Sequence, residues 1–379
     1  MNQPVDEQTT DTQVEQPNQS HNQPRVAILI EQGFEDSEFQ VPYRALQASG
    51  ADVYVVGPRM NERYQGKRRY VSTKLDVTFA EIRADRFDAV VIPGGHAPDY
   101  MRSNTNVVRF IQQAMEQEKI IATVCHGPQV LIEADVIRGK RLTGFHSIRQ
   151  DLENAGSQYV NEPLVVDTNL ITARRPGDLV SFTTALLSRL GLKPHDGNLP
   201  DDSGNDTTDA WTLAEAWGGS SRREIVTCLN VAIRGERYGL HSFEKYAEKT
   251  SDLEVAAALR EICVIKEKHI QMLKARLAAF DGNESFLAAN SAVYARFKHW
   301  FRKSKGNEIL RRALGDLQTG VVDAYRLQNS LTDPITVAIF DEIVEDLSKN
   351  EQWLASLYQA RTDESLRPAK PTTGIAVTS

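Results

Sequence analysis

The sequence predicts a chain of two parts, an α/β domain with a parallel sheet followed by an all-helical four-helix bundle. Over residues 25–192, short apolar strands alternate with helical segments, and this alternation is typical of a parallel sheet covered on both faces. From residue 221 the hydrophobic period changes to that of long amphipathic helices. A chain of 379 residues is also longer than a single hydrophobic core usually supports.

The strands of the first part are predicted from short apolar runs, and its helices from apolar residues that recur with the helical period. Strands are expected at 26–30, 52–56, 89–92 and 121–124, and helices at 37–50, 105–118 and 177–190. The apolar runs 164–166 and 170–172 are separated by the short polar turn Asp167-Thr168-Asn169 and predict a hairpin.

Polar segments with little hydrophobic content flank and separate the two parts. We expect disordered tails over 1–24 and 362–379 and a linker over 193–220, which leaves 25–192 for the α/β domain and 221–361 for the bundle. Trp211 and Trp217 indicate that part of the linker packs against something.

The second part divides into long helices joined by short connections, with one exception. The helices are expected at 221–248, 252–280, 306–331 and 333–361. Residues 281–305, rich in aromatic side chains, form a long crossover between the second and third helices. A four-helix bundle with one long crossover is a ferritin-like arrangement, and the segment resembles a ferritin-like, stress-associated module.

A di-iron site in such a bundle needs inward-facing Glu residues and Glu-x-x-His motifs. Glu236 and His269 lie on inward stripes, but Lys266 stands where a second Glu is expected, and a lysine repels a cation. We therefore expect Glu236 to pair with Lys266 across the core, with His269 nearby, and no metal or other cofactor. Residual metal binding is the alternative. Cys228 and Cys263 follow the pattern of core residues.

The chemistry-bearing stretch of the first part is Ile121-Ala122-Thr123-Val124-Cys125-His126-Gly127-Pro128. An apolar strand breaks into a helix at a thiol, which is the geometry of a nucleophile elbow. The sharp turn and the helix start behind Cys125 favour the thiolate form, so this pattern predicts a lowered thiol pKa. A thiol that reacts slowly with alkylating reagents at about pH 6 to 8, or that is sealed away from solvent, would contradict the chemistry expected of this residue.

Composition excludes several classes of protein. A net charge of −7 argues against a nucleic-acid binder. Three cysteines are too few for a disulfide framework, which indicates a reducing compartment. There is no apolar run long enough for a membrane span and no signal-peptide pattern at the start, so a cytoplasmic location is expected.

Four separated motifs carry a resemblance to a known family. They are Phe34-Glu35-Asp36, Pro93-Gly94-Gly95-His96-Ala97-Pro98-Asp99, Val124-Cys125-His126-Gly127-Pro128 and Arg175-Pro176-Gly177-Asp178-Leu179. Together they resemble the PfpI family of the class I glutamine amidotransferase-like superfamily, which includes intracellular cysteine peptidases, glyoxalases and a protein deglycase. The resemblance implies a flavodoxin-like sandwich and a homo-oligomer, often a dimer or hexamer.

The resemblance also implies a role for each matched residue. Cys125 matches the nucleophile and His126 its acid and base. Asp99 matches an acid that orients the histidine, in related enzymes from an adjacent subunit, although many members have Glu there. Glu35 matches the carboxyl group that hydrogen-bonds the sulfur, and the N–H groups of Gly95 and His126 match the oxyanion hole.

Two histidines outside these roles, His96 and His146, lie either near the pocket or at ordinary surface or core positions.

These observations predict a stress-related cysteine enzyme that attacks a carbonyl carbon, with His126 managing the proton. Glyoxalase or deglycase chemistry on a small carbonyl compound and peptide hydrolysis both fit, and a compact elbow slightly favours the small carbonyl. The alternative is a redox-sensing or chaperone-like protein in which Cys125 is oxidised without turnover. Neither reading involves nucleic acid or a membrane.

Overall fold

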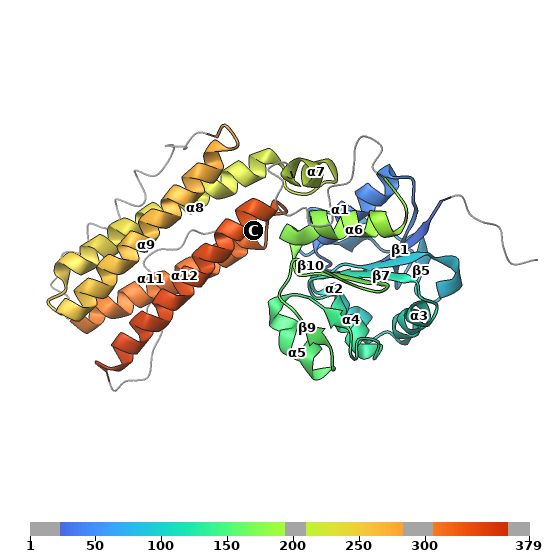
Figure 1. The fold of residues 1–379 in the computed structure, drawn as a ribbon, viewed down its shortest axis with the longest axis horizontal. Coiled ribbons are helices and arrows are strands. Elements are labelled where there is room, and N and C mark those ends of the chain that lie inside the picture. Colours follow the sequence, from blue (N-terminus) through green and yellow to red (C-terminus); the bar gives the residue numbers. More distant parts are fainter. Residues whose placement is uncertain (1–22, 194–209, 283–305, 363–379) are drawn as a thin grey trace, which may run out of the picture.

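The structure, a computed structural model, describes residues 23–193, 210–282 and 306–362. An α/β domain and a bundle of long helices lie side by side, as the sequence predicts (Figure 1). The predicted tails, much of the predicted linker and nearly all of 281–305 lie outside the described residues.

The α/β domain is built on one central sheet. Within the described residues, its order is β10-β11-β7-β6-β1-β2-β5. Neighbouring strands are parallel except β10 and β11, which form the expected hairpin. The strands are β1 (Arg25–Leu29), β2 (Asp52–Gly57), β5 (Val77–Thr78), β6 (Ala89–Ile92), β7 (Ile120–Val124), β10 (Leu164–Asp167) and β11 (Leu170–Ala173). Two small ribbons pair β3 (Tyr64–Gln65) with β4 (Ser72–Thr73), and β8 (Arg141–Leu142) with β9 (Gln158–Tyr159).

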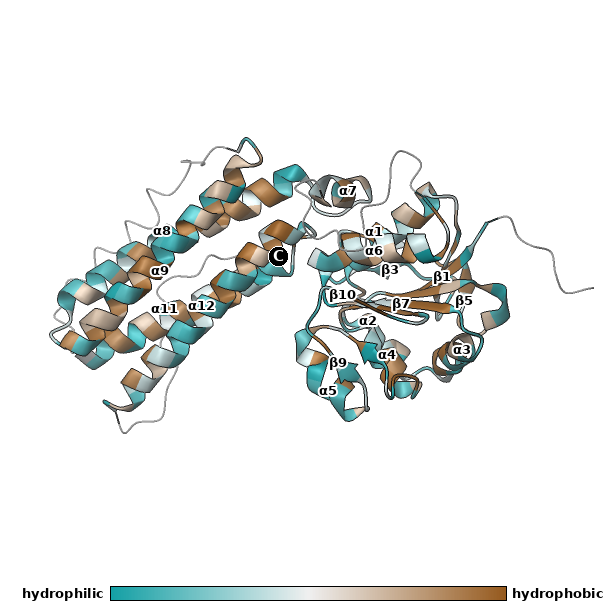
Figure 2. Cartoon of the chain, viewed as in Figure 1, coloured by the Kyte–Doolittle hydropathy of each residue, from teal (hydrophilic) through white to brown (hydrophobic). Residues whose placement is uncertain are grey.

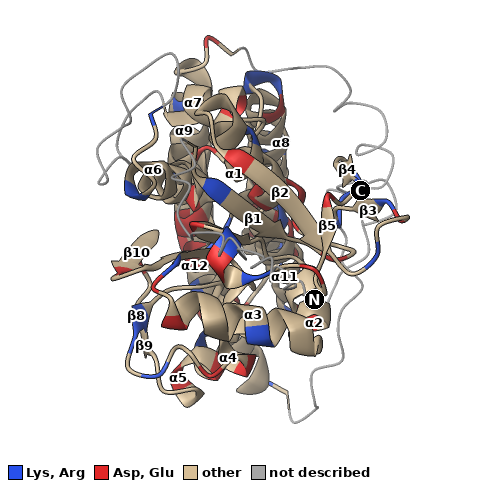
Figure 3. Ribbon diagram, turned by 90° about the vertical axis from the view of Figure 1, so that its right-hand side faces the viewer, with Lys and Arg blue, Asp and Glu red and all other residues tan. Residues whose placement is uncertain are grey.

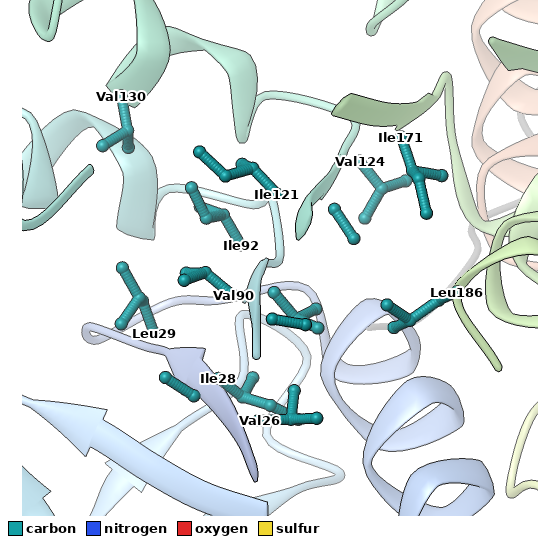
Figure 4. Packing of buried hydrophobic residues seen from close by; sticks show 14 of the residues in the cluster. Val26, Ile28, Leu29, Val90, Ile92, Ile121, Val124, Val130, Ile171 and Leu186 are labelled. Carbon is teal, nitrogen blue, oxygen red and sulfur yellow. The ribbon is translucent and has the colours of Figure 1, made fainter. Parts of the chain in front are cut away.

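Helices cover both faces of the sheet, as a parallel sheet requires. α1 (Asp36–Ala48) and α6 (Leu179–Arg189) lie on one face, and α2 (Ala97–Met101), α3 (Thr105–Glu116) and α4 (Pro128–Glu133) lie on the other (Figure 1). The remaining short helices are η1 (Ala84–Arg86), η2 (His146–Ile148), α5 (Arg149–Asn154) and η3 (Pro176–Asp178). Figure 2 shows the strands as the most hydrophobic part of this domain, and Figure 4 shows strand side chains packed with Val130 of α4 and Leu186 of α6.

In the described residues of the second part, 210–282 and 306–362, four long helices lie within a few residues of the expected ranges. They are α8 (Arg222–Lys249), α9 (Leu253–Ala278), α11 (Gly306–Gln328) and α12 (Pro334–Gln359). The starts of α8, α9 and α12 are fixed by caps. Ser221 makes a capping box with Glu224, and Asp252 and Asp333 accept hydrogen bonds from the first turns of their helices.

The predicted charged pair in the bundle core is confirmed. Lys266 Nζ lies 3.2 Å from Glu236 Oε2, and His269 Nδ1 lies 3.3 Å from the same oxygen. The other nitrogen of His269 lies 3.3 Å from Asp346, a partner that the sequence did not suggest. Burial opposes the charge of Glu236, but Lys266 and His269 lower its pKa overall. In the part of the chain that the structure describes, no group of three or more His, Cys, Asp or Glu side chains is placed to hold a metal ion.

A short helix inside the predicted linker joins the two parts. α7 (Ala210–Ala216) is followed by Trp217, which is buried in the core of the α/β domain. Trp211, on the same helix, packs against the bundle core, where its ring meets Phe280 at 5.3 Å between centroids. The two tryptophans therefore anchor one helix in both cores.

The surface carries both signs of charge. In Figure 3, Lys and Arg residues (blue) and Asp and Glu residues (red) are interspersed along the strands and helices. Among the described helices, none has a stretch apolar enough and long enough to cross a bilayer.

Candidate active site

The predicted site residues gather at the carboxyl edge of the sheet. β1 ends shortly before Glu35, β6 leads into Gly94 and Gly95, β7 into Cys125, and β11 into Arg175. Because parallel strands end at the same edge, four separated motifs meet there. This edge is where ligands bind in open α/β sheets.

Cys125 occupies the strained turn that the sequence predicts. Its φ is 61°, in the left-handed region that a residue with a side chain rarely adopts. Two backbone hydrogen bonds hold it there, one from its N–H to the Ala173 carbonyl at 3.0 Å and one from the Phe145 N–H to its own carbonyl at 2.9 Å. Backbone strain fixed in this way is typical of functional sites.

His126 lies beside the sulfur. Cys125 Sγ and His126 Nδ1 are 3.2 Å apart, and His126 Nε2 is 3.2 Å from Ser147 Oγ. If Nε2–H donates to the serine hydroxyl, Nδ1 is free to accept the thiol proton. Burial, followed by the charge of Lys67, lowers the pKa of His126 to about 4, so the imidazole is neutral at pH 7.

The carboxyl group next to the sulfur is Glu38, and the placement of Glu35 there is wrong. Glu38 is fully buried, accepts a hydrogen bond from the Gly94 N–H at 2.8 Å and faces the Cys125 thiol. Burial, with a contribution from the charge of Glu35, raises the pKa of Glu38 to about 8. Glu38 therefore holds a proton at neutral pH and can donate it to the sulfur.

Glu35 instead anchors a basic loop over the site. Its carboxylate forms an ion pair with Lys67 and lies 3.5 Å from Arg68 Nε. The loop is held by Asp36, whose carboxylate accepts backbone hydrogen bonds from Arg68 and Tyr70 at 2.9 Å each. The charge of Lys67 favours the thiolate of Cys125, a role that the sequence did not suggest.

The expected lowering of the Cys125 pKa does not occur. Burial, followed by the charge of Glu38, raises the pKa of the thiol well above its usual range. The helix start contributes little because α4 is short and the N–H groups of Gly127 and Gln129 are bonded to carbonyls of the same turn. Cys125 is only 4% exposed, so the thiolate must form as a substrate binds, by proton transfer to a neighbour.

Gly94 and Gly95 allow the β6 loop to approach the nucleophile. A Cβ on Gly94 would lie 2.7 Å from the Cβ of Cys125 and 2.8 Å from the His126 nitrogen. Gly95 has a φ of +80° and forms an isolated antiparallel β-bridge with Phe34. The two hydrogen bonds of this bridge are donated by the N–H groups of Glu35 and His96, so the Gly95 N–H is not used in it. Within the described residues, the N–H groups of Gly95 and His126 have no backbone acceptor, as an oxyanion hole requires.

The remaining candidates, Asp99, His96 and His146, are exposed. Asp99 is exposed on α2, and within this chain His126 bonds to Ser147 rather than to Asp99. His96 and His146 are both exposed, yet the charge of each contributes to lowering the pKa of His126, so both lie near it.

Comparisons with known proteins agree with this geometry. Residues 24–189 match the model of the DJ-1/PfpI family. Over 168 residues the chain is 38% identical to protein/nucleic acid deglycase 2 of Escherichia coli, which covers 44% of this chain and 98% of that protein. Over 158 residues it is 39% identical to deglycase PfpI of Pyrococcus furiosus, which covers 42% and 94%.

A solved structure matches both halves. It is the crystal structure of a two-domain protein from Anabaena variabilis that contains DJ-1/ThiJ/PfpI-like and ferritin-like domains. That protein is 52% identical, with a TM-score of 0.86 that covers 93% of this chain and 100% of the other.

Proposed function

This chain belongs to the DJ-1/PfpI family, and on that premise we propose that it is a cysteine-dependent enzyme acting on small carbonyl compounds such as methylglyoxal and their adducts. The observation that carries the proposal is the thiol–imidazole pair at 3.2 Å, beside two N–H groups without backbone acceptors. Two similar proteins are named deglycases, which supports this class of substrate.

The first chemical step is addition of the sulfur to the aldehyde carbon. As the Sγ–C bond forms, the thiol proton moves to His126 Nδ1 and the carbonyl π electrons become an oxyanion. The N–H groups of Gly95 and His126 are placed to stabilise that charge, and removal of one such donor typically costs about 2.7–4 kcal/mol of barrier. Return of the proton to oxygen gives a hemithioacetal.

For methylglyoxal, the next step moves a proton from the aldehyde carbon to the neighbouring carbon through an enediol. The product is a lactoyl thioester of Cys125. Water then hydrolyses the thioester, which restores the thiol and releases lactate, so the net reaction is the addition of one water. His126 and Glu38, both next to the sulfur, are the groups available to carry these protons.

The peptidase and sensor alternatives fit the site less well. A peptide substrate needs access along the chain on both sides of the scissile bond, whereas Cys125 is 4% exposed. Burial raises the pKa of this thiol, which slows its oxidation by peroxide, whereas addition to a bound carbonyl can proceed with transfer of the thiol proton to His126 Nδ1, 3.2 Å from the sulfur.

The test is turnover by the purified full-length protein. We expect wild type to convert methylglyoxal to lactate, Cys125→Ser to be inactive, and Cys263→Ala, a partly buried cysteine in the bundle, to match wild type. Cleavage of unstructured peptides without methylglyoxal turnover would instead support the peptidase. A peroxide-dependent mass increase on Cys125 without either activity would support the sensor.

Assembly is a separate proposal. Asp99 is exposed and does not reach His126 in its own chain, so we propose that it pairs with the site of a second copy in a homo-oligomer. Analytical ultracentrifugation of wild type tests this directly, and a monomer at micromolar concentration would contradict it.

A further inference from the structure

The helical bundle docks at the carboxyl edge of the sheet, next to the cysteine. Arg175, which follows β11, forms a bidentate ion pair with Asp341 of α12. Arg68 donates to the carbonyls of Asn329 at 2.6 Å and Ser330 at 3.3 Å, at the carboxyl end of α11. These contacts fix the end of α11 against the same loops that carry the site.

One side chain of α11 points into that junction. The ring of Tyr325 meets the ring of His146 edge-on, with centroids 5.6 Å apart and planes at 87°. It also meets Phe145, at 6.3 Å between centroids. Phe145 in turn lies against His126, at 4.9 Å. A continuous row of rings therefore runs from the bundle to the imidazole beside the sulfur.

The electrostatics agree with this placement. Burial, followed by the negative charge that the Cys125 sulfur carries when ionised, raises the pKa of Tyr325 to about 12. The phenol thus lies in the field of the nucleophile although 200 residues separate the two in sequence. It stays protonated throughout the working pH range.

We propose that Tyr325 is a specificity-determining residue of the cysteine site, and that the bundle, through this ring, forms a wall that admits compact carbonyl compounds and excludes bulky ones. This inference rests on the proposed function, because it names the substrate class of the same site. The ring packs edge-on against His146 and contacts Phe145, which itself lies against His126.

A structural role alone makes a different prediction. If Tyr325 only fills the junction between the two parts, its removal changes stability and leaves the size preference of the site unchanged. If the ring is a wall, its removal changes the relative rates of large and small reagents even where stability is unaffected.

The experiment compares full-length wild type with Tyr325→Ala, Tyr325→Phe and Val322→Ala, an exposed residue on the same helix. Alkylation of Cys125 is followed by mass spectrometry with compact iodoacetamide and bulky N-phenylmaleimide. Turnover is measured with methylglyoxal and with its bulkier adducts on N-acetylated amino acids. We expect Tyr325→Ala to raise the bulky-to-compact ratio about tenfold in both assays, a typical effect of pocket size on selectivity.

Tyr325→Phe keeps the ring and should match wild type, as should Val322→Ala. Unchanged ratios in Tyr325→Ala would overturn the proposal. Thermal unfolding first checks that each variant folds, and Tyr325→Leu, which fills more of the junction, replaces the alanine variant if that one does not.

The two proposals fail in different ways. If wild type turns over no carbonyl compound, the proposed function is refuted. The ratio of bulky to compact alkylation would still show whether the Tyr325 ring limits access to the Cys125 sulfur. Wild type that turns over methylglyoxal while Tyr325→Ala changes neither ratio would overturn the role of Tyr325 alone.

Discussion

Replacing Glu38 by Gln should stabilise the α/β domain while impairing its chemistry. The carboxyl group is fully buried, and its pKa is raised to about 8 from an ordinary value of 4.5. Unfolding exposes the group, which then ionises at any pH above its ordinary pKa. The unfolded state therefore binds fewer protons than the native state between these two values, and the stability of the wild type falls as pH rises through that window.

The magnitude follows from the same shift. At pH 7 the pH lies about 2.5 units above the ordinary pKa of 4.5, so ionisation of Glu38 stabilises the unfolded chain but not the native one. At 1.36 kcal/mol per unit, this lowers the free energy of unfolding of the wild type by about 3 kcal/mol. Glutamine cannot ionise, can still accept the Gly94 N–H bond and can still donate to the sulfur. For a domain of this size we expect the melting temperature of Glu38→Gln to rise by about 6–12 °C at pH 7.

The assay is thermal unfolding of wild type and Glu38→Gln from pH 4.5 to pH 9, together with methylglyoxal turnover. The difference in stability should be absent near pH 4.5, grow with pH and level off above pH 8. Because glutamine cannot exchange a proton with the sulfur, kcat/KM should fall by about 10²-fold or more. A constant difference across the pH range, or a variant less stable than wild type at pH 7, would refute the reasoning.

Glu35→Gln is the matched control, since it alters a neighbouring buried carboxylate with the opposite expected sign. Glu35 is paired with Lys67 and Arg68, so its neutralisation leaves two cations without their partner. We expect this variant to be less stable than wild type by about 1–3 kcal/mol at pH 7.

Three further outcomes are expected. In urea unfolding, Lys266→Met should lower the free energy of unfolding of the bundle by about 3–5 kcal/mol, because Glu236 keeps a buried charge without its partner. A Glu236→Leu/Lys266→Leu double variant should recover most of that loss, and an equally unstable double variant would count against the pair. Asp341→Ala should speed amide exchange at the start of α12 by removing the partner of Arg175, and unchanged exchange would show that this ion pair does not hold the junction. Gly94→Ala should lower kcat/KM by about 10²–10³-fold because its methyl group would crowd the nucleophile and the oxyanion donors, and wild-type turnover would contradict that geometry.

Features with a periodic signal could be predicted from the sequence, and features set by long-range packing could not. The strands, the hairpin and the long helices follow from hydrophobic period, and the Glu236–Lys266 pair follows from the apolar stripes of α8 and α9. The same test applied to α1 would have found Glu38, which shares a helical face with the buried residues Val41 and Ala45.

Residues brought to the site by loops left no local signal. The charge of Lys67 acts on the sulfur because Asp36 holds a loop distant in sequence next to the first helix. Ser147 and Tyr325 reach the histidines through contacts between segments far apart in the chain. The raised thiol pKa also depends on such packing, because burial outweighs the local dipoles that the sequence reveals.

Because Trp217, directly after α7, packs into the core of the α/β domain, that domain does not end at residue 192. A Trp side chain buries about 150–250 Å², worth about 4–6 kcal/mol at 25 cal/mol per Å². A gene trimmed after residue 192 would lose Trp217 and leave its socket in the α/β core open to water. A truncation or an exchange of either half must therefore retain residues 210–217, whose tryptophans pack into the two hydrophobic cores.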